Sequence, residues 1–480
     1  MFLADNVITE VFDDPTSFRS LVIILNVLVI IGLTIWLFRA RFRTKSKPPN
    51  LTPNYDDDTL ETSRLERVLG WALLCSAVIA IALPVYWLRE PARQSAAETG
   101  FDERSIERGA VLFAAEGGEN FDAALSLACA NCHGGDGSGG SATTVVVPSD
   151  PACEPPEGGE IDFDTQPECR PSQVAWSAPP LDTVFLRYPD QSPDNRTGRD
   201  QIKQIIVFGR PGTPMPAWGT SYGDVTSTGA KNDQAIEDLL NYIESIQLEP
   251  DEAMDRATTE FDNLRGTADP AELADREAAV EEARAKRAAL PDTATEDQTA
   301  EATDAVTNAI NQLGEIQSVP QKAVTDAEVA VEEAAAQLTA ADSPEAVEAS
   351  ELALESARRQ LENAEAWAAS VEEASDGELL FQLNCARCHT DGWSYYNPLD
   401  PDAAPLPGPQ GGGAFGPNLR DGSEVRQFPN AADHSAFIFS GSTYQVPYGV
   451  AGIGTGRMPG FGQMLTEEQI DAIVEYERDL

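Results

Sequence analysis

The sequence predicts a mainly α-helical membrane protein with several domains, and three observations support this prediction. Two uninterrupted apolar runs near the N-terminus are each close to the length of a membrane-spanning helix. Two later regions repeat the same motifs in the same order, and each begins and ends with a helical pattern. A segment rich in Ala and Glu separates these regions. The chain of 480 residues is long enough for two or three domains.

The apolar runs cover residues 21–38 and 68–88. Acidic residues precede the first run and a basic cluster follows it, so we interpret it as an uncleaved span and not as a signal peptide. The positive-inside rule places the basic loop in the cytoplasm and the rest of the chain outside. The expected segments are an extracytoplasmic N-terminus at 1–18, transmembrane helices at 19–39 and 67–88, and a cytoplasmic loop at 40–66. The protein is therefore expected in the cell membrane, in contact with lipid, as a two-span protein.

The two regions after the membrane segment, 89–248 and 376–480, repeat one another. Both contain Gly-x-x-x-Phe on a predicted helix, then Cys-x-x-Cys-His and a Pro-containing turn. Both continue with an apolar helix that ends in Gly, then Met-Pro-x-aromatic-Gly, and finally an amphipathic helix. The order of these features predicts two copies of one helical domain.

Each copy has the cysteine spacing that attaches c-type haem. The motifs are Cys129-Ala-Asn-Cys132-His133 and Cys385-Ala-Arg-Cys388-His389. Two thiols one helical turn apart reach the two vinyl groups of one porphyrin, and the adjacent His reaches the iron. A lone Cys-x-x-Cys also occurs in redox dithiols and zinc sites, but the following His and the duplication favour haem. The sequence predicts two covalently attached haem c groups, with His133 and His389 as iron ligands.

The second axial ligand of each iron is predicted to be a methionine. The chain has only three histidines, so two haems with two His ligands each cannot form, and His434 is expected to be a helix-end residue. Met215 and Met458 occupy equivalent places in the repeat, whereas Met464 is expected to pack in a core. A thioether ligand raises the reduction potential, which suits the transfer of single electrons.

Two prolines are candidates to orient the ligating histidines. Pro179 and Pro417 follow the two attachment sites, and a ligating His normally donates its second ring N–H to a carbonyl or carboxylate. Both prolines are also compatible with a role in shaping the turn alone.

Both repeated regions resemble class I cytochrome c domains. The resemblance rests on the first helix with its Gly and aromatic residue, the Cys-x-x-Cys-His motif, the Pro-containing turn, the Met loop and the last helix. It covers about half of the chain. The first domain departs from this pattern, because Ala178 replaces a Gly and a long acidic insertion precedes Met215. The insertion holds Cys153 and Cys169, which we predict to form a disulfide, with metal ligation as the alternative.

The order of domains resembles two kinds of respiratory subunit. Two spans followed by two cytochrome c domains resemble the di-haem subunit of cbb3-type oxidases, and the domain pair resembles the di-haem cytochrome c subunit of actinobacterial bcc complexes. Either resemblance implies an electron-transfer subunit, not a stand-alone enzyme, which passes electrons from quinol oxidation toward a terminal cytochrome c oxidase. The implied partners are cytochrome b and Rieske-type subunits or a haem–copper oxidase.

Two other functions stay open. One is a di-haem peroxidase or small-molecule dehydrogenase, which needs one haem with an open coordination position. The other is an assembly scaffold that joins respiratory complexes. Carbon monoxide binding to the reduced protein discriminates between the relay and the first alternative.

Residues 249–375 form a predicted helical spacer that belongs to neither respiratory pattern. Its apolar residues recur at coiled-coil spacing, and Ser343-Pro344 predicts a helix start. We expect short helices that fold on themselves or on a partner, and that set the distance between the haems or dock another subunit. The net charge of −46 argues against a nucleic-acid partner. It leaves open whether the acidic surface steers a basic redox partner or is a general adaptation to salt.

Overall fold

The computed structural model describes most of the chain and is mostly helical, as predicted. The described residues are 28–29, 31–36, 38–39, 61–147, 153, 161, 163, 165–166, 169–188, 198–291 and 293–480. The chain divides into two compact units, Met1–Arg104 and Ser105–Leu480.

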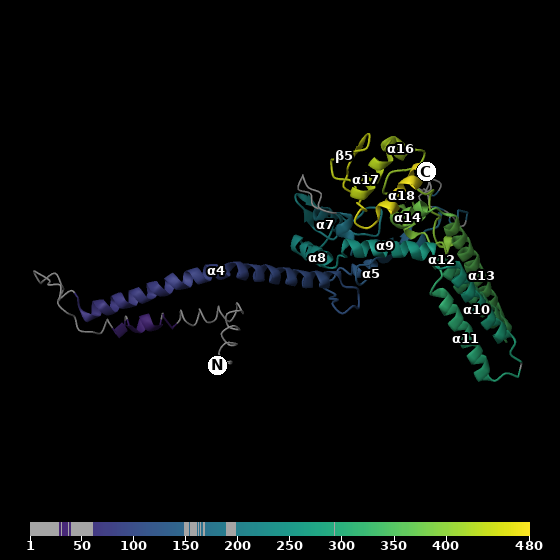
Figure 1. Ribbon diagram of the computed structural model, residues 1–480, viewed down its shortest axis with the longest axis horizontal. Coiled ribbons are helices and arrows are strands. Elements are labelled where there is room, and N and C mark those ends of the chain that lie inside the picture. Colours follow the sequence, from purple (N-terminus) through teal and green to yellow (C-terminus); the bar gives the residue numbers. More distant parts are fainter. Residues whose placement is uncertain are drawn as a thin grey trace, which may run out of the picture. The chain divides into compact units, whose positions relative to one another are not determined.

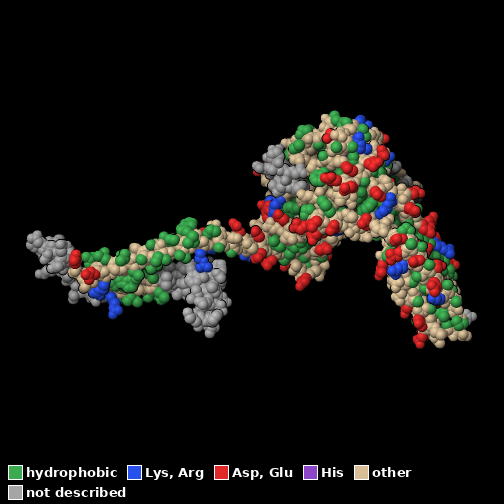
Figure 2. All heavy atoms as spheres, in the orientation of Figure 1, with side chains coloured by type: hydrophobic (Ala, Val, Ile, Leu, Met, Phe, Trp, Pro, Cys, Tyr) green, Lys and Arg blue, Asp and Glu red, His purple; other side chains and the backbone are tan. Residues whose placement is uncertain are grey.

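The first unit contains most of helix α4 (Ser63–Phe113), which continues through Pro84 and Pro91. An 18-residue window of α4 has a mean hydropathy of 2.4 and is not buried inside the protein. Hydrophobic side chains cover this part of the helix (Figure 2). Among the described residues α4 is the one helix long and apolar enough to cross a membrane. The segment 1–18, part of the first predicted span and residues 40–60 of the loop 40–66 lie outside the described residues.

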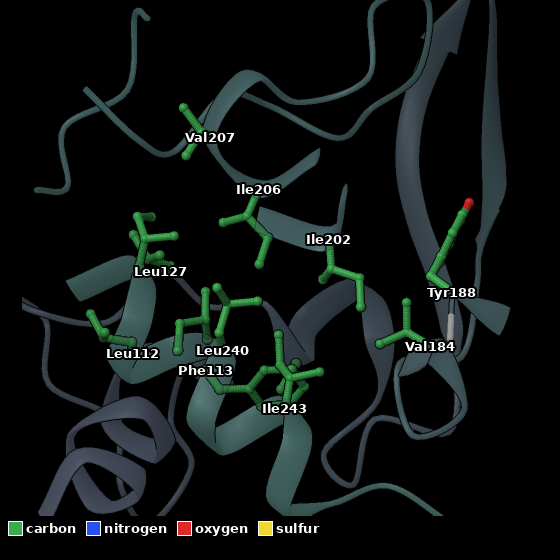
Figure 3. Close-up of a cluster of buried hydrophobic side chains, with 13 residues drawn as sticks. Leu112, Phe113, Leu127, Val184, Tyr188, Ile202, Ile206, Val207, Leu240 and Ile243 are labelled. Atoms are coloured by element: carbon green, nitrogen blue, oxygen red, sulfur yellow. The ribbon is translucent and has the colours of Figure 1, made fainter. Parts of the chain in front are cut away.

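The second unit begins with the last turns of α4, which cross α8 (Asp233–Ser245). A Cβ atom added to Gly109 would lie 2.1 Å from the backbone oxygen of Asp238, so the two backbones meet at this glycine. The rings of Phe113 and Tyr242 pack beside the crossing, 5.1 Å apart. Figure 3 shows the buried side chains around it, which come from the end of α4, from α7 and α8, and from the segments that hold Leu127, Val184 and Tyr188.

The first repeat, residues 105–248, is completed by short elements between these two helices. They are α5 (Ala130–His133), β1 (Gly140–Val146), β2 (Ser172–Ala178), α6 (Val184–Arg187), α7 (Gly198–Phe208), β3 (Ser221–Tyr222) and β4 (Val225–Thr226). Strands β1 and β2 pair antiparallel, with Gly140 opposite Ala178 and Val146 opposite Ser172. This β1–β2 hairpin is part of the insertion, and its Cys153 and Cys169 are joined by a disulfide.

The second repeat, residues 376–480, has the same helix crossing. Its elements are α14 (Asp376–Asn384), α15 (Ala386–His389), η4 (Trp393–Tyr395), η5 (Pro401–Ala403), α16 (Ser423–Gln427), α17 (Ala431–Ser440), β5 (Pro447–Tyr448), β6 (Gly452–Ile453) and α18 (Glu467–Asp479). A Cβ on Gly377 of α14 would lie 2.1 Å from the oxygen of Ala472 in α18. Phe381 and Tyr476 pack beside it with ring centroids 5.4 Å apart. The Gly-x-x-x-Phe motif therefore has the same packing role in both repeats.

The segment between the repeats forms five consecutive helices. They are α9 (Pro250–Arg265), α10 (Pro270–Ala288), α11 (Glu296–Gly314), α12 (Val319–Ala340) and α13 (Pro344–Glu373). Helices α10 to α13 run beside one another as an elongated bundle (Figure 1), and Arg284 of α10 pairs with Glu332 of α12 at 3.1 Å. Ser318 and Gln321 form a capping box at the start of α12, which satisfies free N–H groups there.

Helix α9 differs from the bundle because it contacts both repeats. Its Arg256 pairs with Asp182 of the first repeat at 2.6 Å, and its Phe261 packs against the core of the second. At its end, Arg265 pairs with Asp376 at 3.0 Å.

Candidate haem sites

Helix α5 is a single turn that carries the first predicted attachment motif, with Cys129 at its N-cap and His133 at its end. The ring atom Nδ1 of His133 lies 2.8 Å from the carbonyl oxygen of Pro179. A carbonyl only accepts, so Nδ1 carries the proton in this contact. Nε2 is then the ring nitrogen with a free lone pair for a metal ion.

The second motif lies on α15, with Cys385 at the N-cap and His389 as the last helical residue. Nδ1 of His389 lies 3.0 Å from the carbonyl oxygen of Pro417. The preceding residue, Gly416, passes so close to the imidazole that an added Cβ would lie 2.5 Å from its Cε1 atom. Glycine is required there because any side chain would displace the ring.

The cysteines of both motifs are not joined to one another by a disulfide. Burial raises the pKa of Cys129 to about 12 and raises that of Cys385 well above its usual value. Thiol–disulfide catalysts need a lowered thiol pKa, whereas burial shifts the pKa of Cys129 and of Cys385 the other way. The described residues contain no group of three or more His, Cys, Asp or Glu side chains that fits a metal ion.

The two predicted Met ligands lie in loops held in the same way. The carbonyl of Met215 accepts from Arg210 N at 3.1 Å, and that of Met458 accepts from Ser442 N at 3.0 Å. A glycine with positive φ precedes each loop: Gly209 ends α7 and Gly441 ends α17, and a Cβ on either would lie 2.7 Å from the Met carbonyl. By contrast, Met464 is buried in the second repeat, with 8% of its surface exposed.

Comparison with known protein families identifies both repeats. The model of the family described as Cytochrome c matches residues 106–247. The model described as Cytochrome C oxidase, cbb3-type, subunit III matches residues 372–476. The chain contains cytochrome c domains. Neither the curated proteins nor the solved structures gave a match.

Cytochrome c domains carry haem c bound through cysteines, and the residues present fit this group. Each motif offers two thiols on one helical turn and a histidine. The carbonyl contact of that histidine is made by Nδ1, so its Nε2 can bind the iron. When bound, haem c supplies one-electron redox chemistry at its iron, with a potential that the axial ligands tune. The protein contributes the ring orientation of the histidines and the course of the two Met loops.

The two cytochrome domains contact each other through the segments that carry these residues. Arg387, inside the second attachment motif, donates through Nη2 to Ser177 Oγ at 3.2 Å. Gly460, in the second Met loop, donates its N–H to the carbonyl of Arg187 at 2.9 Å. Segment 177–188 of the first domain, which includes Pro179, therefore touches both ligand loops of the second domain.

The β1–β2 hairpin extends the same interface. Trp176 packs on Tyr395 of the second domain with ring centroids 5.2 Å apart. A cavity of about 750 Å³ opens beside this pair. It is lined by the hairpin, by residues 212–214, by Arg387, and by residues 390–392, 394–395 and 413–416 of the second domain. None of the four predicted iron ligands lines it. The insertion in the first domain is thus part of the contact between the domains.

Sequence reasoning missed a buried polar cluster in the second domain. His434 of α17 lies 3.0 Å from Glu477 and 3.4 Å from Glu424, measured from its Nε2 atom. Its ring stacks on Phe428 with centroids 4.9 Å apart. The three polar residues come from three different helices, so no sequence spacing indicates the cluster.

Proposed function

We propose that this chain is a membrane-anchored di-haem c-type cytochrome that acts as an electron-transfer subunit of a respiratory complex. It carries electrons from quinol oxidation toward a terminal cytochrome c oxidase. The direct contact between the ligand-bearing segments of the two cytochrome domains carries this proposal. Such a contact keeps two redox centres at one fixed separation, which a relay requires.

In this proposal each domain holds one haem c. The thioether bonds form at Cys129 and Cys132 in the first domain and at Cys385 and Cys388 in the second. His133 and Met215 ligate the first iron, and His389 and Met458 the second. The contacts of Pro179 and Pro417 with the two imidazoles support the assigned ring nitrogen, because such contacts fix the tautomer of a ligating His.

The proposed location is the cell membrane, with both haem domains outside the cytoplasm. The apolar part of α4 supports an anchor, and the disulfide between Cys153 and Cys169 suits an oxidising compartment. The match of residues 372–476 to an oxidase subunit family supports a haem–copper oxidase as partner. Cytochrome b and Rieske-type subunits are the other partners that we consider.

The test replaces each proposed Met ligand by leucine, which has a similar volume but cannot coordinate iron. We expect Met215→Leu and Met458→Leu each to change the optical spectrum of one haem and to let carbon monoxide bind it after reduction. The reduced wild-type protein is expected not to bind carbon monoxide. Met464→Leu is the matched control, because Met464 lies in the core, and its spectrum should match the wild type.

Two outcomes contradict the proposal. Carbon monoxide binding to the wild-type protein would reveal an open iron and favour a peroxidase or dehydrogenase. Unchanged spectra in both Met variants would show that neither methionine ligates iron. Purification in mild detergent then identifies the complex: an oxidase core alone favours the cbb3-like assignment, and a cytochrome b with an iron–sulfur protein favours the quinol-oxidising one.

A further inference from the structure

Three arginines gather where the two cytochrome domains meet. Arg187 lies at the end of α6, Arg210 follows α7, and Arg387 lies between the two cysteines of the second attachment motif. Burial lowers the pKa of Arg187 to about 10, and the positive charges of Arg387 and Arg210 contribute to this. All three guanidinium groups contact segment 177–188 of the first domain. The three positive charges are therefore brought together on one short stretch of chain.

These arginines have few partners in the described part of the chain. Arg187 donates through Nη2 to the carbonyl of Pro180, and Arg210 donates through Nη2 to the hydroxyl of Tyr188 at 3.2 Å. Arg387 donates to Ser177 Oγ. All three acceptors are neutral, and no carboxylate among the described residues forms an ion pair with any of the three arginines.

Two buried donors have no hydrogen-bond partner at all in the described part of the protein: Nε of Arg187 and Nη1 of Arg387. A guanidinium does not lose its proton in a protein, and an unpaired buried charge is costly. In a chain with net charge −46, carboxylates are abundant on the surface (Figure 2). Among the described residues, Asp182 and Glu260 act on Arg187 and Arg387 only through their charge, without an ion pair. The arrangement fits an anion that is supplied by a bound group.

We propose that Arg187, Arg210 and Arg387 together bind haem carboxylate at the junction of the domains, so that Arg387 of the second domain helps to hold the haem of the first. This inference rests on the haem binding proposed above. Each haem c carries two carboxylates, and arginine pairs with a carboxylate through two parallel N–H donors.

The location favours a haem carboxylate over a free anion. Pro180, the acceptor of Arg187, directly follows Pro179, whose carbonyl contacts His133. Ser177, the acceptor of Arg387, lies two residues before Pro179. Both arginines therefore contact the segment that orients His133. Arg387 belongs at the same time to the attachment motif of the second haem. It is therefore a positioning residue between the two sites.

The test is a redox titration of the full-length, haem-loaded protein in detergent. Reduction adds negative charge to a haem, so a nearby buried cation stabilises the reduced form. We expect Arg187→Gln and Arg387→Gln each to reduce the equilibrium constant for reduction of the first haem at least tenfold, which is 59 mV for one electron. Arg387→Lys retains the positive charge and should therefore shift the potential of the first haem less than Arg387→Gln does. The Met variants above assign each potential to its haem.

The matched control is Arg426→Gln, because Arg426 is exposed on α16 and donates to the backbone of Asp421; both potentials should stay unchanged. Potentials that are unchanged in both Gln variants, with wild-type haem spectra and circular dichroism, would overturn the inference and leave the proposed function intact. Equal shifts of the first haem potential in Arg387→Gln and Arg387→Lys would also overturn the inference.

Titration with inorganic phosphate separates the two anion sources. A potential that depends on phosphate in the wild type but not in Arg187→Gln would assign the site to a free anion and overturn haem carboxylate as the ligand.

Discussion

A buried polar cluster in the second cytochrome domain contains a carboxyl group with a raised pKa. The cluster is formed by His434, Glu424 and Glu477, and the carboxyl group is that of Glu424. Burial raises the pKa of Glu424 from its ordinary value of 4.5 to about 7; His434 opposes this shift, the negative charge of Glu477 adds to it and Arg478 opposes it. The folded protein therefore holds a proton on Glu424 at pH values where the unfolded chain has lost it.

The raised pKa of Glu424 predicts that the stability of the protein depends on pH. Between pH 4.5 and 7 the folded state binds more protons than the unfolded state, so the free energy of unfolding should fall as the pH rises. Glu424→Gln cannot ionise and should show a flatter profile over this window. Denaturant unfolding at several pH values measures it, with Glu475→Gln as the control because Glu475 is exposed on the same domain. Parallel profiles for wild type and Glu424→Gln would refute the assignment.

At the scale of elements, the crossing of the first and last helices organises each cytochrome domain. Gly109 and Gly377 occupy the crossing points, where an added Cβ would lie 2.1 Å from a backbone oxygen of the facing helix. The aromatic residue of the Gly-x-x-x-Phe motif packs one turn later against a tyrosine of the last helix. The motif thus lets two backbones approach and then fills the space beside them.

We expect Gly377→Ala to destabilise the second domain. The methyl group would overlap the backbone of Ala472, and forcing extra atoms into a packed site typically costs about 1–3 kcal/mol. Gly314→Ala is the control, because Gly314 ends α11 and an added Cβ would meet nothing nearer than 3.6 Å. Denaturant midpoints of the haem-loaded variants give the comparison. A Gly377→Ala protein as stable as the control would show that the helices do not cross at this glycine.

At the scale of the whole second unit, helix α9 and the spacer bundle have separate roles. Helix α9 connects the two cytochrome domains through Arg256 and Phe261. The chain leaves α9 at Gly266 and returns at Ser318, where a Cβ on Gly266 would lie 3.1 Å from the Cβ of Ser318. The excursion through α10 and α11 therefore starts and ends at one place.

This geometry predicts that α10 and α11 are dispensable for the haem domains. Replacing residues 267–317 by a short glycine linker should leave the spectra and potentials of both haems unchanged. Deleting α9 as well should disturb them, because the contacts of Arg256 and Arg265 are lost. If the shorter deletion instead releases a co-purifying oxidase while both haems stay normal, the spacer acts as a docking arm. A changed potential in the shorter deletion would contradict the prediction.

The sequence by itself determined the two cytochrome c domains and the mainly helical fold. Covalent attachment needs Cys and His within five consecutive residues, so the motif at Cys129 and its repeat at Cys385 are visible without any structure. The repeat likewise pairs Met215 with Met458 and Gly109 with Gly377. For the two predicted membrane spans the outcome is different. The second span lies in α4, which is long and apolar enough to cross a membrane. The first span lies partly outside the described residues.

Only the tertiary structure decided how the domains meet. Arg187 and Arg387 belong to different domains, and the cluster around His434 joins three helices. Nothing in their sequence spacing indicates these contacts, because they depend on how separate helices pack. Helix α9 belongs to the predicted spacer 249–375, yet it packs against a cytochrome core. Local covalent chemistry can be read from the order of residues, whereas burial and the pairing of charges depend on elements that are distant in the chain.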